Sequence, residues 1–292
     1  MIVIKGNLDE YRFDKEKNQI QSGKFSNAYK AIGSAGEYFL VKEISHTSNN
    51  LIGISRFKRE AAIQVSHPNL LIVKESFSFQ DKQYLVRSWV NGNDLAKHAK
   101  KLSSNKIKEI ILPLFEALEA LHQNKILHMD VQPKNILIGV EGKIWLTDFG
   151  LSIFCEEEIS QRQPFSIYYG APEQILNLSQ LFNASTDLYA VGIILYELIT
   201  GQKPFYHNNP EVLMNLCLAS PLPKHNIPDD WFAFILKLTA KPRFLMPPTH
   251  FTKQQLITEL LNSQSERFQS ANDAANALLC LSDFKRKWWV WF

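Results

Sequence analysis

The sequence predicts an α+β protein with two unequal lobes, a small antiparallel β-sheet lobe followed by a larger, mainly helical lobe. Strand-like runs separated by short turns are concentrated in the first 90 residues. In the longer remainder, apolar residues recur with the period of an α-helix. A polar stretch with two carboxylates and an amide follows the change of pattern, where the lobes would meet. Because clefts between lobes are favoured ligand sites, we expect the function to reside there.

The composition is that of an ordinary globular protein, with 45% hydrophobic and 21% charged residues in a chain of 292. A net charge of +3 does not indicate nucleic-acid binding. The three cysteines are sparse and lack metal-ligand spacing, which favours reduced thiols in a reducing compartment. No signal peptide or transmembrane-length apolar run is visible, so we expect a cytoplasmic location.

The small lobe, residues 1–90, is predicted to contain five strands and one helix. Three sequential strands joined by tight turns come first, and the third, residues 37–44, carries Lys42 near its end. Apolar residues then recur at a 3.6-residue period from Leu51 to Val65, which predicts the helix. Two further strands complete the sheet, at residues 70–78 and 84–90.

The large lobe, residues 91–292, is predicted to be mainly helical. Its clearest element is an amphipathic helix over residues 106–124, which the pattern supports despite Pro113. This helix ends just before the polar stretch, so it would deliver the chain to the junction between the lobes.

The polar stretch has a spacing that suits phosphoryl transfer. Asp130 and Asn135 lie five residues apart, and Asp148 follows Asn135 by thirteen residues. The intervening residues, 136–146, are predicted to form two short apolar strands around a turn, which would fold Asp148 back beside the first loop. Phosphoryl transfer needs one carboxylate near the attacking hydroxyl and oxygen ligands for Mg²⁺ against a triphosphate.

Several segments in the same order resemble the eukaryotic-type protein kinase family. They are Phe39-Leu40-Val41-Lys42, His128-Met129-Asp130, Asn135, Asp148-Phe149-Gly150 and Ala171-Pro172-Glu173. The resemblance covers essentially the whole chain and implies the bilobal protein-kinase-like fold, with ATP and Mg²⁺ bound between the lobes. It also implies transfer of the γ-phosphate of ATP to protein hydroxyls, Ser/Thr rather than Tyr.

The resemblance also implies roles for single residues. Asp130 would accept the substrate hydroxyl, and Gln132 would hydrogen-bond the transferring phosphate. Asn135 and Asp148 would hold Mg²⁺. Lys42 would contact the nucleotide phosphates while paired with Glu60, which is the only acidic residue between Glu43 and Glu75.

The nucleotide itself would lie in the cleft between the two lobes. By resemblance, the positions that contact it are Gly23 in the glycine-rich loop, Ala28 and Leu40 above the adenine, Ser88 and Val90 in the hinge, and Leu137 below. Arg87 stands immediately before the hinge, where apolar residues are the norm in the family. A charge there must find a partner or solvent.

Other positions would support the scaffold. Asp187 would brace the backbone of the catalytic loop, and His128 would pack under Phe149. Glu173 would form an ion pair with Arg267.

Departures from the family pattern keep two alternatives open. Only Gly23 remains of three loop glycines, Met129 stands where many members have Arg, and Gln132 stands where Ser/Thr kinases have Lys. These changes favour a pseudokinase, a nucleotide-binding scaffold with the same fold. A small-molecule kinase of related fold is the second alternative, which the Ala-Pro-Glu segment disfavours. The chain would thus act on a protein substrate, and the sequence indicates no oligomeric state.

Two segments stand outside the family pattern. Residues 241–261 resemble a lineage-specific insertion, which would serve either for docking or for packing, with a helix from Lys253 to Leu261. The last eight residues, 285–292, combine three basic residues with three Trp and a Phe. They would lie at a membrane interface, dock a partner or pack on the large lobe.

Overall fold

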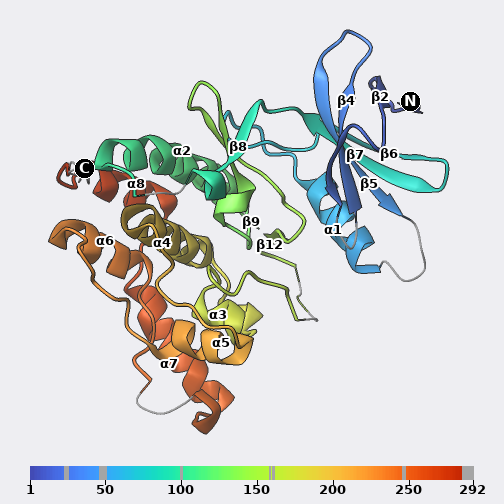
Figure 1. Cartoon of the computed structure of the whole chain (residues 1–292). Coiled ribbons are helices and arrows are strands. Elements are labelled where there is room, and N and C mark those ends of the chain that lie inside the picture. The colour runs from blue at the N-terminus through green and yellow to red at the C-terminus, as the bar shows by residue number, and fades with distance from the viewer. Residues whose placement is uncertain are drawn as a thin grey trace.

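The computed structural model describes residues 1–22, 26–45, 51–98, 101–157, 159, 162–244 and 248–284. It has the two unequal lobes that the sequence predicts, a curled antiparallel sheet with one helix and a larger helical lobe (Figure 1). The predicted contacts of Gly23 and the tail at residues 285–292 lie outside the described residues. Among the described helices, none combines the length and apolar character needed to cross a membrane.

The small lobe is built on a sheet of seven strands rather than the predicted five. Its strand order is β1-β2-β4-β5-β7-β6, with β3 paired to β4. The strands are β1 (Ile2–Lys5), β2 (Glu10–Phe13), β3 (Gln19–Ser22), β4 (Ser26–Ile32), β5 (Tyr38–Ser45), β6 (Glu75–Phe79) and β7 (Lys82–Ser88). The unpredicted pair is the hairpin of β1 and β2, in which Ile4, Tyr11 and Phe13 face the core.

A buried carboxylate explains why this hairpin joins the sheet. Glu75, the first residue of β6, accepts hydrogen bonds from the backbone of Asn7 at 2.7 Å and Leu8 at 3.1 Å. It also accepts the hydroxyl of Tyr11. Since β6 and β1 are the two ends of the strand order, these contacts curl the sheet on itself.

Two predicted boundaries in this lobe are wrong. The strand expected over residues 70–78 begins only at Glu75, because the backbone of Leu70 bridges to Leu146 in the large lobe. The helix α1 (Leu51–Ala62) ends three residues before Val65. Ile63 and Val65 instead bury their side chains in the core of the large lobe.

The large lobe packs its helices around one long buried helix, α4. The helices of this lobe are α2 (Ser104–Gln123), α3 (Pro172–Ile175), α4 (Ala184–Thr200), α5 (Pro210–Ala219), α6 (Asp229–Leu238), α7 (Lys253–Ser265) and α8 (Ala271–Leu279). The predicted helix around Pro113 is continuous as α2. Since both α2 and α4 bury one whole side or more, they form the rigid base from which the loops at the lobe junction project.

Short strands connect this base to the junction. They are β8 (Gly92–Asp94), β9 (Ile126–Leu127), β10 (Ile136–Gly139), β11 (Ile144–Leu146) and β12 (Ile153–Phe154). The predicted hairpin over residues 136–146 is confirmed, with Ile136 opposite Leu146 in an antiparallel pair of β10 and β11. The hairpin brings Asp148 back beside the loop that carries Asp130.

The segment predicted to be an insertion, residues 241–261, is partly described. Its helical half forms the start of α7, which packs Leu256, Ile257 and Leu260 against Leu178 and Leu181. In the other half, the rings of Phe244 and Phe251 lie 5.3 Å apart. These contacts favour a packing role for the segment.

Candidate active site

The loop that carries Asp130 is held from below by Asp187, a buried residue in the first turn of α4. The Asp187 carboxylate accepts the backbone N–H groups of His128 and Met129, each at 2.8 Å. His122 Nε2 lies 2.9 Å from the same carboxylate. Burial opposes the charge, but these hydrogen bonds hold the pKa of Asp187 below its ordinary value. The predicted brace is confirmed.

His128 has the structural role that the sequence suggests. Its ring is fully buried and packs edge to face against Phe149, with centroids 5.2 Å apart. Burial lowers its pKa, which favours the neutral imidazole, and Nε2 lies 3.2 Å from the carbonyl oxygen of Thr147. The ring therefore links the two loops of the site.

Asp130 is oriented by two amide side chains. Gln132 Nε2 donates to both carboxylate oxygens, at 2.9 and 3.0 Å. Asn135 Nδ2 donates to Oδ2 at 2.9 Å and to the backbone carbonyl of Asp130 at 2.8 Å. Burial raises the pKa of Asp130 to about 6, and the charge of Asp148 acts in the same direction. A carboxylate with this pKa is ionised at neutral pH yet suited to take up a proton.

Lys42 lies between two carboxylates that come from different lobes. Its Nζ atom is 2.7 Å from Glu60 Oε2 on α1 and 3.5 Å from Asp148 Oδ1. The ion pair expected between Lys42 and Glu60 is therefore present. Burial opposes the charge of Lys42, but Asp148 and Glu60 raise its pKa, and Lys42 in turn lowers the pKa of Asp148.

Asn135 and Asp148 offer a donor set that fits Mg²⁺. The amide nitrogen of Asn135 is engaged by Asp130, so its oxygen is the atom that remains for a metal ion. The Asp148 side chain is half exposed, at 52%. Mg²⁺ is commonly held by one or two protein oxygens together with substrate phosphates. In the described part of the chain, no group of three or more His, Cys, Asp or Glu side chains is placed to hold a metal ion.

The predicted nucleotide contacts surround the same site. Ala28 on β4 lies opposite Lys42 on β5, and Leu40 lies two residues before Lys42, so all three share one face of the sheet. Ser88 ends β7, and Val90 follows it in the connection to the large lobe. Leu137 lies on β10 below, opposite Asp94 of β8. Their contacts with a nucleotide stay predictions.

One residue of the site escaped the sequence analysis. Arg59 on α1 donates to the carbonyl oxygen of Ser152 at 3.0 Å and to Glu157 Oε1 at 2.6 Å. It thereby ties the helix that carries Glu60 to the segment that follows Asp148. No local pattern marks this residue, because its partners lie more than 90 residues away and one of them is a backbone atom.

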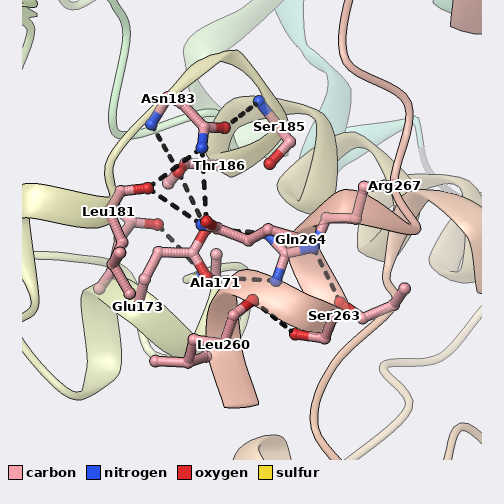
Figure 2. A network of polar contacts seen from close by, with 12 residues as sticks. Ala171, Glu173, Leu181, Asn183, Ser185, Thr186, Leu260, Ser263, Gln264 and Arg267 are labelled. Carbon is pink, nitrogen blue, oxygen red and sulfur yellow. Dashed lines mark hydrogen bonds and ion pairs between the residues drawn. The ribbon is translucent and has the colours of Figure 1, made fainter. Parts of the chain in front are cut away.

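The segment that follows Glu157 ends at Glu173, which forms a buried ion pair with Arg267. Arg267 Nη1 and Nη2 donate to the two oxygens of Glu173, at 2.8 and 3.2 Å. Both side chains are fully buried, and Thr186 donates to the same carboxylate (Figure 2). The predicted pair is confirmed. It fixes α3 to the base of the large lobe, and α3 is the end of the segment that leads from Asp148 to Glu173, here called the activation segment.

Met129 occupies an apolar environment where many family members have Arg. It is 4% exposed and belongs to a buried cluster with Leu127 and Ile153. Its backbone has a positive φ of 66°, which the hydrogen bonds from Met129 to Asp187 and from Gln174 to Met129 hold in place. The side chain at position 129 therefore contributes an apolar contact rather than a charge in this chain.

We expect Met129→Arg to give no gain in phosphate transfer and to lower the free energy of unfolding by about 1–3 kcal/mol, because it places a charge in an apolar cluster. Urea denaturation and a transfer assay would measure the two effects. Leu236→Arg is the control, since Leu236 is 43% exposed and its replacement should change stability by less than about 0.5 kcal/mol. A large gain in transfer would show that position 129 controls activation.

Comparison with known proteins agrees with this geometry. The model of the protein kinase domain matches residues 15–277. The probable serine/threonine-protein kinase PknB of Lactococcus lactis is 33% identical over 208 residues, 68% of this chain and 32% of that protein. The serine/threonine protein kinase ypkA of Aspergillus fumigatus is 30% identical over 224 residues, 75% of this chain and 32% of that protein.

A further relative is similar over more of its own length. Aurora/IPL1-related protein kinase 2 of Caenorhabditis elegans is 27% identical over 194 residues, 64% of this chain and 63% of that protein. The first two relatives are thus much longer than the part that this chain matches, which is 32% of each. From the match over residues 15–277 and the assembled site, we conclude that the chain belongs to the protein kinase domain family.

Proposed function

We propose that this chain is an active serine/threonine protein kinase, which transfers the γ-phosphate of ATP to hydroxyl groups of a protein substrate. The observation that carries the proposal is the assembly around Lys42, whose Nζ atom lies 2.7 Å from Glu60 and 3.5 Å from Asp148. Asp130 stands in the adjoining loop with both oxygens oriented. A scaffold that only binds a nucleotide would need fewer of these groups.

The residues suggest the following division of work. Lys42, held by Glu60, would bind phosphate oxygens of ATP and fix their position. Asn135 and Asp148 would hold Mg²⁺, which supplies charge stabilisation for the transferring phosphate when it is bound. Gln132 would keep the Asp130 carboxylate aimed at the substrate hydroxyl.

Asp130 would then act as the general base that accepts the proton of the substrate hydroxyl. The hydroxyl oxygen of the substrate forms a bond to the γ-phosphorus, and the bond from that phosphorus to the bridging oxygen of ADP breaks. Asp130 takes the hydroxyl proton, for which a pKa of about 6 is suitable near neutral pH. Gln132 carries no charge, so the transferring phosphate receives less stabilisation from this position than a lysine would provide.

The protein-substrate class follows from the segment beyond the site. Ser166 donates to Gln132 at 3.4 Å, and this segment continues into α3, which the pair of Glu173 and Arg267 anchors. A fixed platform next to Asp130 suits a polypeptide chain better than a small molecule. Relatives named as serine/threonine protein kinases support the same class.

A nucleotide-binding scaffold is the second candidate, and one observation favours it. Arg87 brings an additional, partly buried cation to the site, beside the bulky Leu40 above the expected adenine position. If these side chains prevent productive binding, the fold would serve a partner rather than a reaction.

The test is transfer of labelled phosphate from ATP, with Mg²⁺, to the chain itself and to a generic protein substrate. We expect transfer, and we expect Asp130→Asn to lower it by about 100-fold or more, because a general base contributes about 10²–10⁴-fold. Phosphosite mapping would separate Ser/Thr from Tyr. Tight ATP binding without transfer would instead support the scaffold, and equal transfer by Asp130→Asn would remove Asp130 from the mechanism.

A further inference from the structure

Arg87 places a second cation on the ceiling of the nucleotide site. It is the second-last residue of β7 and lies opposite Leu40 of β5, while Leu85 lies opposite Lys42. Residues two apart on a strand face the same side, and directly opposed residues share a side. The side chains of Arg87 and Lys42 therefore project from one face of the sheet into the same region.

The electrostatic environment of Arg87 agrees with this placement. Burial lowers the pKa of Arg87, and the carboxylates that act on it in the other direction are Glu60 and Asp148. These are the two carboxylates that Lys42 already contacts at 2.7 and 3.5 Å. The charge of Arg87 in turn contributes to the lowered pKa of Asp148. The site thus holds two cations and two carboxylates on neighbouring elements.

The guanidinium group of Arg87 nevertheless lacks hydrogen-bond acceptors for part of its donors. Its Nη1 atom is buried and has no hydrogen-bond partner among the described residues. Within the described part of the chain, Arg87 forms no ion pair at 4 Å or less, whereas Lys42 lies within that distance of both carboxylates. A buried guanidinium donor without an acceptor is unfavourable, and it favours any ligand that brings anionic oxygens to it.

We propose that Arg87 is a second phosphate-binding residue of the nucleotide site, whose Nη1 donates to a phosphate oxygen of the bound nucleotide beside Lys42. The inference rests on the proposed function, because it takes a nucleotide as the ligand. A guanidinium suits phosphate oxygens through its planar set of donors. Two fixed cations also neutralise part of the phosphate charge, so nucleoside diphosphates and triphosphates should bind well even without a divalent metal.

The test compares ligands that differ only in their phosphates. Dissociation constants for adenosine, ADP and ATP are measured by calorimetry in EDTA, for the unmodified chain and for Arg87→Met. Methionine keeps an unbranched side chain but has no donor and no charge. We expect ADP and ATP to bind about tenfold more weakly or worse to the variant, a change that corresponds to about 1.4 kcal/mol. Adenosine should bind equally well to both.

Two further variants make the comparison specific. Arg12→Met removes an exposed cation from β2 of the same sheet, 52% exposed, and should leave all three constants unchanged. Arg87→Gln keeps a neutral amide donor group but removes the charge, and it should show the same selective loss for ADP and ATP, in case the methionine variant folds poorly. Thermal unfolding of each variant shows that the fold is retained.

The outcomes separate this inference from the proposed function. Equal weakening of adenosine and ADP would mean that Arg87 contacts the base or only fills space, and the inference would be wrong. Unchanged constants for all ligands would also overturn it. Binding of ATP without any phosphate transfer would contradict only the proposed function, whereas failure of the unmodified chain to bind ATP or ADP would contradict both.

Discussion

Asp148→Asn should abolish Mg²⁺-dependent phosphate transfer while the fold survives. The variant keeps the shape of the side chain but loses the charge that faces Lys42 at 3.5 Å and that would hold the metal ion. A metal ion supplies several kcal/mol of charge stabilisation, so we expect a loss of about a thousandfold or more in transfer rate. The measurement is labelled phosphate transfer over a titration of Mg²⁺.

The backbone at this position explains why the variant should fold. Asp148 has a positive φ of 67°, a conformation that Asp and Asn adopt more readily than most residues. Asp81→Asn is a matched control, since Asp81 also has a positive φ, of 59°, but lies in an exposed turn of the small lobe. The control should keep full transfer. Unchanged transfer by Asp148→Asn would remove Asp148 from the mechanism.

Arg267→Met should destabilise the large lobe by about 3–5 kcal/mol, because it leaves the fully buried Glu173 carboxylate without its cation. Urea denaturation at neutral pH would measure the change in the free energy of unfolding. Thr186 still donates to Glu173 in the variant but carries no charge. The double variant Glu173→Met/Arg267→Met should recover most of the loss, since replacing both members of a buried pair with apolar side chains is often nearly neutral.

An exposed pair of the same length is the control. Lys106 and Glu109 lie 2.8 Å apart, the same distance as Arg267 and Glu173, but their side chains are 45% and 61% exposed. Glu109→Met should therefore cost less than about 1 kcal/mol. If both single variants lost equal stability, burial would not be the source of the effect.

The pair of Glu173 and Arg267 also predicts a pH dependence. Burial opposes the charge of Glu173, but Arg267 holds its pKa below the ordinary value of 4.5. Because the folded-state pKa is the lower one, the contribution is fully present above pH 4.5 and is lost as the pH falls through the folded-state value. The free energy of unfolding of the unmodified chain, measured relative to that of the double variant, should thus fall only in that acidic range.

Much of the site could be predicted because its signals are local. Asp130, Asn135 and Asp148 are spaced along one loop and one hairpin, and the hairpin is visible as two apolar runs around a turn. The pairing of Lys42 with Glu60 was predictable for a different reason, since no other acidic residue lies between Glu43 and Glu75.

The N-terminal hairpin and the ends of α1 and β6 could not be predicted in the same way. The hairpin joins the sheet through Glu75, 64 residues beyond Tyr11 in the sequence. The strand β6 starts late because Leu70 pairs with Leu146 of the other lobe. These element boundaries are set by pairing partners from distant segments. Secondary-structure propensity within a short window carries no information about such partners.

The sequence by itself determines the spacing of the site residues and predicts the two-lobed α+β architecture, because hydrophobic periodicity and turn residues act over a few positions. The contacts of the unusual side chains, Arg59 and Arg87, cannot be predicted in this way. The contact of Arg59 with Ser152 arises only when α1 meets the segment that follows Asp148, and the unsatisfied Nη1 of Arg87 arises only when β7 pairs with β5. Whether a buried charge finds a partner depends on atoms from separate elements, and folding alone brings those atoms within reach of one another.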